Sequence, residues 1–213
     1  MQDVTVTGMV ISSMPIGEYD RRLEILTAEF GRISAFARGA RKPSSPLVAC
    51  SRSFAFGSFT LFQGRSTYTL SSAKISEFFE ALSSDFELNC YGSYFLETAK
   101  YFSRENLRAD DMLKLLYMSL KAIQLESLEN RLVKAIYEIK LLDINGILKL
   151  PDKNTMSETC AYAVEYVKNN PTGKIFNFKL SKEVLDEFEK TADRLFERAT
   201  DVKFKSLEML ETI

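Results

Sequence analysis

Short runs of alternating apolar and polar residues fill the first 80 positions of the chain, and Gly, Pro or Ser separates each run from the next. Alternation with a period of two predicts β-strands, because neighbouring side chains of a strand point to opposite faces. Five strands are expected, in VTVTGMVISS, RRLEILTA, GRISAFA, RSFAFGSFTLFQG and RSTYTLSSAKI. Five short strands with internal bends favour a small closed barrel over a flat sheet.

The fourth of these runs changes its alternation halfway along. Phe54 and Phe56 have one parity, whereas Phe59 and Leu61 have the other. A β-bulge at Gly57-Ser58 would turn all four side chains toward one interior, and we predict a bulge there. Large aromatic side chains in strands are more often buried than exposed. We therefore predict that the following residues fill the barrel core: Phe54, Phe56, Phe59 and Phe62.

From about residue 81 the apolar residues recur every three to four positions, which is the period of an α-helix. Helices are predicted within 83–106, 108–127, 128–148, 156–170 and 181–199, with a last turn or two in 203–213. The 161–168 stripe is predicted to be helical core, and 174–180 to be extended. The fold class is therefore α+β, with a barrel domain at 1–80 and a helical domain at 81–213. The absence of a long linker predicts that the two pack together.

The residue types exclude several kinds of chemistry. The chain has no His, and its three Cys residues are far apart, at Cys50, Cys90 and Cys160. Ser–His catalysis, Cys–His catalysis and His-ligated metals are therefore excluded, and no Cys-x-x-Cys pair offers a zinc or redox site. We predict no catalytic residue, no metal and no cofactor, with each Cys buried in a reducing compartment. No apolar run could span a membrane and no signal-peptide pattern begins the chain, which predicts a cytoplasmic protein.

Charge is distributed unevenly, although the whole chain has a formal net charge of −1. Residues 1–80 have a net charge of +2, and residues 81–213 have a net charge of −3. The 47 residues from Phe30 to Ser76 contain no Asp or Glu. They contain seven cations: Arg32, Arg38, Arg41, Lys42, Arg52, Arg65 and Lys74. Such a surface attracts polyanions, because each bound phosphate releases condensed counterions.

A cationic barrel with aromatic side chains is typical of proteins that bind single-stranded nucleic acid, because phosphates follow the cations while bases stack on the rings. The predicted DNA contacts centre on the Gly- and Pro-containing segment FARGARKPSSP, which presents Arg38, Arg41 and Lys42. Further cations would widen this patch or lie at its edge: Arg32, Arg65, Lys74 and Arg22. Phe36 and Tyr68 either stack on bases or pack in the barrel. Arginines that only confer solubility are the simpler alternative.

Four short motifs occur in order along the barrel half: Gly8–Ile11, Gly17–Asp20, Phe30–Arg32 and the basic turn Arg38–Lys42. Together they resemble the N-terminal barrel of the RecO family of recombination mediators. FTLFQGRSTYTLSSAKI is similar to the fourth and fifth strands of that family, YFLETAKYF to its first helix and KFKSLEML to its C-terminal segment. The resemblance is specific over about the first 80 residues and looser afterwards.

This resemblance implies an OB-fold barrel followed by a helical domain, and a non-enzymatic role in DNA repair and recombination after DNA damage. It implies binding of single- and double-stranded DNA, annealing of complementary strands and, indirectly, loading of RecA onto strands coated by single-strand-binding protein. The implied partners are RecR, often RecF, and the C-terminal tail of single-strand-binding protein, at the bacterial nucleoid. Many relatives have a four-cysteine zinc finger in the helical domain. Here 146–180 contains only Cys160, so a shortened region without zinc is expected.

The acidic helical half is expected to stay off the DNA and to bind proteins. An apolar groove edged by Lys114, Lys121 or Arg131 would suit an acidic protein tail. Two alternatives to DNA binding differ in class. An OB-fold adaptor that binds only protein predicts no gel shift of labelled single-stranded DNA. A hydrolytic nuclease would need clustered carboxylates for a metal ion, and the acid-free window offers none.

Overall fold

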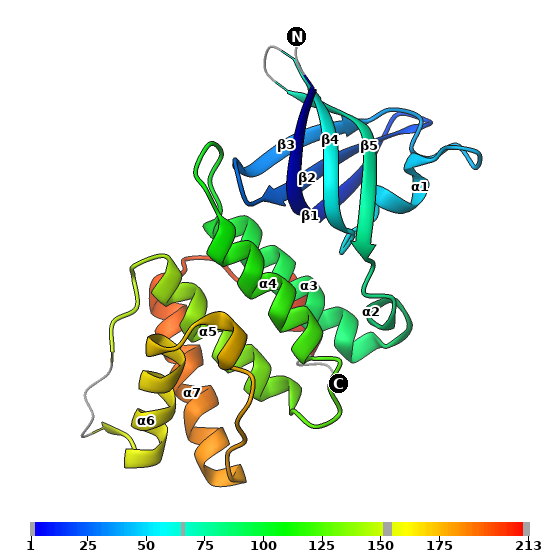
Figure 1. The fold of residues 1–213 in the computed structure, drawn as a ribbon. Coiled ribbons are helices and arrows are strands. Elements are labelled where there is room, and N and C mark those ends of the chain that lie inside the picture. Colours follow the sequence, from blue (N-terminus) through cyan, green and yellow to red (C-terminus); the bar gives the residue numbers. More distant parts are fainter. Residues whose placement is uncertain (1–2, 65–66, 151–154, 211–213) are drawn as a thin grey trace. The chain divides into compact units, whose positions relative to one another are not determined.

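A computed structural model describes residues 3–64, 67–150 and 155–210 of the chain. Apart from the short helix α1 (Leu47–Cys50), the strands precede the helices along the sequence (Figure 1). The chain divides into two units. The barrel unit comprises Met1–Glu80 and Leu96–Leu113, and the helical unit comprises Ala81–Phe95 and Lys114–Ile213.

Five strands form the barrel: β1 (Asp3–Ile16), β2 (Asp20–Thr27), β3 (Gly31–Ala37), β4 (Phe56–Gln63) and β5 (Tyr68–Glu77). They close in the order β1-β2-β3-β5-β4. Neighbouring strands are antiparallel except for β3 and β5, which pair in parallel and complete the closure. The five-stranded barrel of an OB fold, followed by helices, confirms the predicted α+β class.

Strand β1 is long because it serves two neighbours. Its first half pairs with β4, and its second half pairs with β2, with Gly8 and Met9 paired on both sides. The register with β2 shifts between Val10 and Ser12. Such an irregularity bends a strand and increases its twist, which allows a single strand to pass from one side of a barrel to the other.

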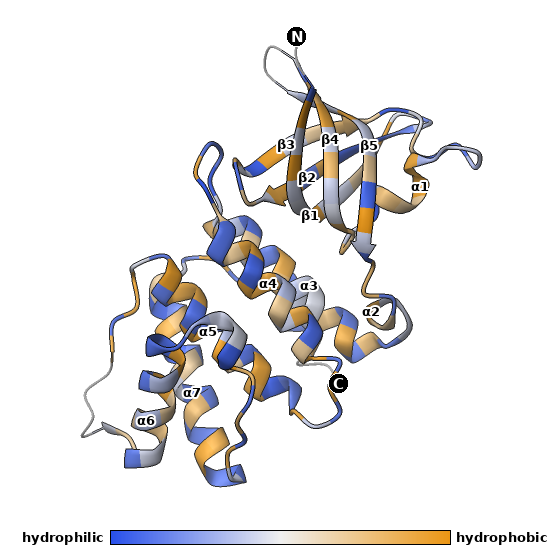
Figure 2. Ribbon diagram, in the orientation of Figure 1, coloured by the Kyte–Doolittle hydropathy of each residue, from blue (hydrophilic) through white to orange (hydrophobic). Residues whose placement is uncertain are grey.

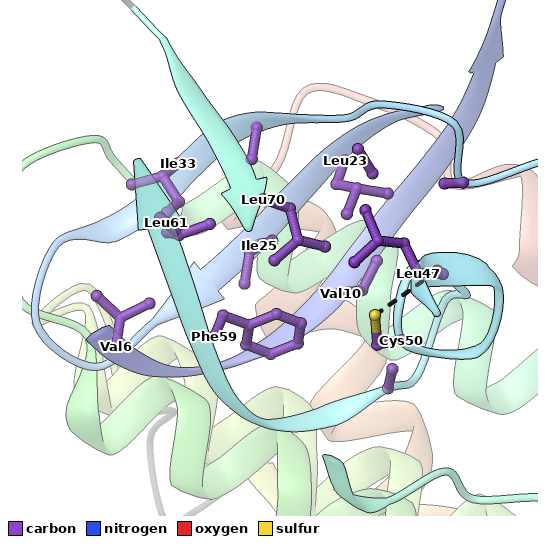
Figure 3. Packing of buried hydrophobic residues seen from close by; sticks show 14 residues of the cluster. Val6, Val10, Leu23, Ile25, Ile33, Leu47, Cys50, Phe59, Leu61 and Leu70 are labelled. Atoms are coloured by element: carbon purple, nitrogen blue, oxygen red, sulfur yellow. Dashed lines mark hydrogen bonds between the residues drawn. The ribbon is translucent and has the colours of Figure 1, made fainter. Parts of the chain in front are cut away.

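The barrel interior is a cluster of buried apolar side chains (Figure 3). Phe59 is fully buried among branched residues from the other strands. The short helix α1 (Leu47–Cys50) adds Leu47 and Cys50 to this cluster, and the Cys50 thiol donates to the carbonyl oxygen of Leu47 at 3.6 Å. All three Cys side chains are buried thiols, as predicted. Burial raises the pKa of the Cys50 thiol, which keeps it protonated and unreactive.

The prediction for the fourth run is only partly right. Phe59 and Leu61 join the interior cluster, and Phe54 is buried just before β4 begins. Phe56 and Phe62 are only half-buried, so their assignment to the core is wrong. The register of β4 with β5 does shift next to Gly57, but alternation within β4 is unbroken. The half-buried positions Phe56 and Phe62 therefore have the parity of the outer face.

Gly31 is the position in the barrel unit where a side chain would be most harmful. Its φ is +65°, and a Cβ there would lie 2.1 Å from the carbonyl oxygen of Arg104 and 2.4 Å from that of Leu107. The close approach exists because Arg32 N donates to the same Arg104 carbonyl at 3.1 Å. An alanine at Gly31 would thus incur both backbone strain and a clash with backbone atoms.

We expect Gly31→Ala to lower the free energy of unfolding by about 3 kcal/mol. Gly17→Ala is the matched control, because its φ is +56° and nothing lies within 4 Å of its Cβ position. That variant should lose only about 1 kcal/mol, the cost of the left-handed conformation. Urea denaturation of both variants measures the difference. Equal losses would mean that the contact with the Arg104 carbonyl does not constrain the barrel unit.

The helices are α2 (Ala81–Ser84), α3 (Phe86–Phe102), α4 (Asp110–Ala122), α5 (Asn130–Ile144), α6 (Glu158–Asn169), α7 (Lys182–Ala199) and α8 (Lys205–Leu210). Helix α5 packs against α6 and α7 and is buried from Leu132 to Leu142. Helix α7 alternates hydrophobic and hydrophilic residues along its length (Figure 2), as an amphipathic surface helix does. Ser157 and Ser181 cap α6 and α7, because their hydroxyls accept from Cys160 N and Val184 N.

Two predictions about the end of the chain are corrected. Residues 174–180 form no strand, because Lys174 ends the 3-10 helix η2 (Thr172–Lys174) and a turn follows it at 175–177. A strand needs a pairing partner, and residues 155–210 contain no other strand. The 161–168 stripe is core only in part. Ala163, Val164 and Val167 are buried, but the Tyr162 side chain is 68% exposed.

Candidate nucleic-acid interface

The basic turn follows β3 and is fastened to the turn between β1 and β2. Arg41 N donates to the carbonyl oxygen of Tyr19 at 2.8 Å, and the Arg41 guanidinium donates to that of Gly17 at 3.0 Å. The Lys42 ammonium lies 5.1 Å from the centre of the Tyr19 ring, a cation–π distance. These contacts fix the backbone of the turn, while the side chains of Arg38, Arg41 and Lys42 remain exposed.

Gly39 shapes this turn. Its φ is +66°, its N–H donates to Oδ1 of Asp20 at 2.7 Å, and its carbonyl accepts from Lys42 N at 3.0 Å. The carboxylate of Asp20 is therefore directed at the backbone of the turn. Among the described residues, Arg38, Arg41 and Lys42 form no ion pair, so their positive charge is uncompensated by direct contacts.

The register of the strands places a row of side chains across the outer face of the barrel. Met14 pairs with Arg22, Arg22 with Phe36, Phe36 with Thr69, and Thr69 with Phe62. Directly paired residues share one face of a sheet. The residues on either side of Phe36 in β3 belong to the interior cluster, whereas Phe36 is half-buried. Phe36 therefore lies on the outer face. We call these five side chains the outer row.

Tyr68 has the opposite orientation. It pairs with Ala35, an interior residue, and packs half-buried against the interior cluster. Arg22 is held beside β3 because its Nε donates to Oγ of Ser34 at 3.1 Å. The outer row thus combines an aromatic ring and an exposed guanidinium on adjacent strands, and Tyr68 is not part of it.

The remaining cations predicted to contact DNA are placed less favourably for binding phosphates than those of the basic turn. Arg32 is half-buried and lies 3.6 Å from Oε1 of Glu24, whose other oxygen lies 2.5 Å from the Lys100 ammonium. The charge of Arg32 is therefore partly neutralised. Lys74 is exposed on β5 and pairs with Ser58 of β4. Arg65 lies outside the described residues.

Sequence reasoning missed three exposed apolar side chains in and beside the outer row. Met14, Ile16 and Tyr19 are 49%, 39% and 45% exposed. Met14 belongs to the outer row, and Ile16 pairs with Asp20 two positions further along β1. The irregularity between Val10 and Ser12 changes the parity of β1, so alternation in the sequence alone did not show which face these residues occupy.

The helical unit contains a buried charged network. The Lys134 ammonium lies 2.9 Å from Oε1 of Glu138 and 2.6 Å from Oδ1 of Asp193, and the Tyr94 hydroxyl donates to the same Glu138 oxygen. Burial alone would lower the pKa of Lys134, but the charges of Glu138 and Asp193 outweigh it and raise that pKa. Burial raises the pKa of Glu138, and the Lys134 ammonium opposes this effect. The network lines a cavity of about 450 Å³.

The cations predicted to edge a groove for a protein tail lie elsewhere in the helical unit. Lys114 and Lys121 are exposed. Arg131 is half-buried, and its guanidinium contacts Glu129 at 3.1 Å, Asp186 at 2.5 Å and Glu189 at 3.4 Å. An acidic tail would have to displace these carboxylates. None of the three cations lines the cavity beside the buried network.

The barrel surface has the chemistry of binding. Exposed guanidinium and ammonium groups suit phosphates, and an outward ring suits a base. Within the described parts of the chain, no group of three or more His, Cys, Asp or Glu is placed to hold a metal ion. No helix described there is both long and apolar enough to cross a membrane.

A closed five-stranded barrel with this surface, followed by helices, defines a protein of the OB-fold class. Comparison with known families narrows the class. Residues 1–79 match the family described as "Recombination protein O N terminal", and residues 83–148 match "Recombination protein O C terminal". The two matches follow one another in order and together cover most of the chain. The chain therefore belongs to the RecO family of DNA repair proteins.

Individual relatives agree with this assignment. A "DNA repair protein RecO" of Acetivibrio thermocellus is 27% identical over 246 residues, covering 100% of this chain and 98% of the relative. One of Clostridium perfringens is 27% identical over 237 residues, covering 97% and 96%. One of Alkaliphilus metalliredigens is 31% identical over 144 residues, covering 68% of this chain and 58% of the relative.

Proposed function

We propose that this protein is a DNA-binding recombination mediator whose barrel holds single- and double-stranded DNA. The observation that carries the proposal is the outer row beside the basic turn. Arg22 and Phe36 lie on adjacent strands, and Arg38, Arg41 and Lys42 extend the same end of β3. Cations that bind phosphates and a ring that stacks on a base are the two elements of sequence-independent binding to single strands.

The proposed mechanism is non-enzymatic. Two complementary strands repel each other because both are polyanions, and a cationic surface lowers that repulsion when it binds them. The fixed backbone of the basic turn keeps three cations together, so less ordering is required when DNA binds. Annealing of complementary strands follows from this arrangement without any covalent bond being made or broken.

The family resemblance supports finer proposals about partners. The protein would act with RecR, and with RecF where RecF is present, at DNA coated by single-strand-binding protein, and would indirectly help to load RecA at the nucleoid. The acidic tail of single-strand-binding protein would dock at Lys114 and Lys121, the predicted groove cations that are exposed. Arg131 would contribute only after exchanging its present carboxylate partners.

The exposed apolar residues of β1 and the following turn favour one alternative. Met14, Ile16 and Tyr19 give the barrel an apolar border that suits a protein partner. An OB-fold adaptor that binds only protein would use this border without DNA. A gel shift with labelled single-stranded DNA at low salt separates the two functions, because the adaptor predicts no shift.

Phe36→Ala tests the stacking part of the proposal. We expect this variant to bind a single-stranded oligonucleotide about 5-fold to about 150-fold more weakly, the loss of one stacked base. The salt dependence of binding should stay unchanged, because no charge is removed. Phe36→Tyr keeps the ring and is the matched control. Fluorescence anisotropy at several salt concentrations measures both quantities, and unchanged affinity of Phe36→Ala would remove Phe36 from the interface.

A further inference from the structure

The helical unit contains its own acid-free segment. Residues 166–182 carry four Lys and no Asp or Glu, although the rest of 81–213 carries 15 Lys/Arg and 22 Asp/Glu. The four are Lys168, Lys174, Lys179 and Lys182. Except for Lys168, which is half-buried at the end of α6, these side chains are exposed. A concentration of one charge within an otherwise acidic unit makes this segment a local site of attraction for anions.

The backbone of this segment is fixed against α6. The Tyr166 hydroxyl lies 3.2 Å from the carbonyl oxygen of Lys174 and 3.1 Å from Oδ1 of Asn177, so it can donate to either. Ile175 is fully buried, and Thr172 is 6% exposed. The segment is therefore anchored at its centre, while the Lys174 and Lys179 side chains project from it into solvent.

Aromatic rings line the same part of the helical unit. The Tyr162 and Tyr166 rings lie one helical turn apart, with centres 6.4 Å apart and planes at 32°. The Tyr166 ring meets the Phe178 ring edge-on at 5.5 Å. Tyr166 and Phe178 are half-buried, but Tyr162 is 68% exposed. A ring supported on one side by a second ring and open on the other is available for stacking.

Acidic residues limit the extent of this surface. Glu158 lies one turn before Tyr162, and Glu165 lies between the two tyrosines along α6. A polyanion would therefore extend from Tyr162 toward Lys174 and Lys179, away from the beginning of α6.

We propose that Tyr162 and the exposed lysines of 174–182 form a second site for single-stranded DNA, on the helical unit. One base stacks on the Tyr162 ring, and the adjoining phosphates contact Lys174, Lys179 and Lys182. An acidic peptide would be attracted by the lysines but would not need an exposed ring beside them. This proposal departs from the expectation that the helical half stays off DNA. It rests on its own residues and goes beyond the barrel interface proposed above.

A second site would serve annealing. A protein with two separate contacts can hold two strands, or two parts of one strand, at the same time. For a single strand, three lysines that contact phosphates make the logarithm of the association constant fall with the logarithm of salt concentration with a slope of about −2. Binding through so few contacts is weak and depends on low salt. We therefore expect a strand held at this site to be released as the salt concentration rises.

Photo-crosslinking of the whole 213-residue chain tests this inference. A single-stranded oligonucleotide containing 4-thiothymidine is irradiated with the protein, and crosslinked peptides are identified by mass spectrometry. We expect crosslinks within 162–182 in addition to any in the barrel. Tyr162→Ala should lower the yield within 162–182 at least about 5-fold, the loss of one stacked base, and leave barrel crosslinks unchanged. Tyr162→Phe should retain the yield.

The lysines are tested by Lys174→Gln, Lys179→Gln and Lys182→Gln combined, which should also remove crosslinks within 162–182. Lys190→Gln, Lys203→Gln and Lys205→Gln combined is the matched control, with three exposed lysines of the same unit. Crosslinks within 162–182 that persist in both Tyr162→Ala and the Lys174 triple variant, or their absence from the unmodified chain, would overturn the inference. Failure of the barrel proposal is separate, because it removes crosslinks from residues 14–74 only.

Discussion

Combining Arg38→Ala, Arg41→Ala and Lys42→Ala is expected to weaken binding of a single-stranded oligonucleotide about 50-fold at about 0.15 M salt. The salt slope, which is the change in the logarithm of the association constant with the logarithm of salt concentration, should become about 2 units shallower. Each phosphate contact on a single strand contributes about 0.7 to that slope, so the loss of three contacts sets both numbers. The side chains are exposed, and no ion pair within the described residues neutralises them. Fluorescence anisotropy over a salt series measures affinity and slope together.

A control is needed because Arg41 also fastens the basic turn to Gly17. Thermal unfolding of the triple variant should show that the barrel remains folded. A triple variant at Lys190, Lys203 and Lys205 removes the same charge from another exposed surface. If both triple variants lower the slope equally, the effect comes from total charge, and the basic turn is not the DNA contact.

Lys134→Met is expected to lower the free energy of unfolding by about 3 to 5 kcal/mol at neutral pH. The ammonium contacts Glu138 and Asp193, and Glu138 is almost fully buried. Removing the cation leaves a buried carboxylate whose Oε2 has no hydrogen-bond partner among the described residues. An uncompensated buried charge lowers the free energy of unfolding by more than the intact ion pair raises it. The single substitution is therefore strongly destabilising.

The loss should depend on pH. Burial already raises the pKa of Glu138 in the folded protein, and removal of Lys134 raises it further. A carboxyl group with a raised folded-state pKa stabilises the fold below its unfolded pKa of about 4.3, and this contribution is lost as pH rises through the folded pKa. The deficit of Lys134→Met should therefore be smaller at about pH 5 than at about pH 7.5.

Glu138→Gln in the Lys134→Met background tests the same explanation. Glutamine keeps an oxygen to accept from the Tyr94 hydroxyl and removes the buried charge. The double variant should recover much of the stability and lose the pH dependence of the deficit. A deficit that is equal at both pH values and persists in the double variant would show that lost packing, rather than charge, causes the destabilisation.

Alternation within the strands predicted the barrel well, because a period of two is a direct consequence of strand geometry. It failed where the register shifts. The faces of Met14 and Ile16 depend on the irregularity after Val10, and the outward position of Phe62 depends on alternation that continues through β4. The position of Phe36 needed the pairing partners on both sides, and these follow from long-range contacts that no local pattern encodes.

The sequence showed which stretch of the chain is rich in positive charge, but it did not show which of these cations have carboxylates beside them in the fold. The acid-free window contains Arg32, yet Glu24 of the neighbouring strand lies beside it in the fold. The contacts of Lys134 with Asp193 and of Arg131 with Asp186 join residues more than 50 positions apart. Tyr162 has the helical spacing of a core residue, and only the packing of α6 shows that it faces solvent. Separation along the chain therefore limited what the sequence could show.

Direct binding of DNA is the property from which the proposed function follows, and titration of the unmodified chain tests it most simply. A labelled single-stranded oligonucleotide is titrated by fluorescence anisotropy at salt concentrations from about 50 mM to about 200 mM. We predict saturable binding, and the logarithm of the association constant should fall linearly with the logarithm of salt concentration. The oligonucleotide should be intact afterwards. Absence of binding at about 50 mM salt would contradict the account and favour an adaptor that binds only protein.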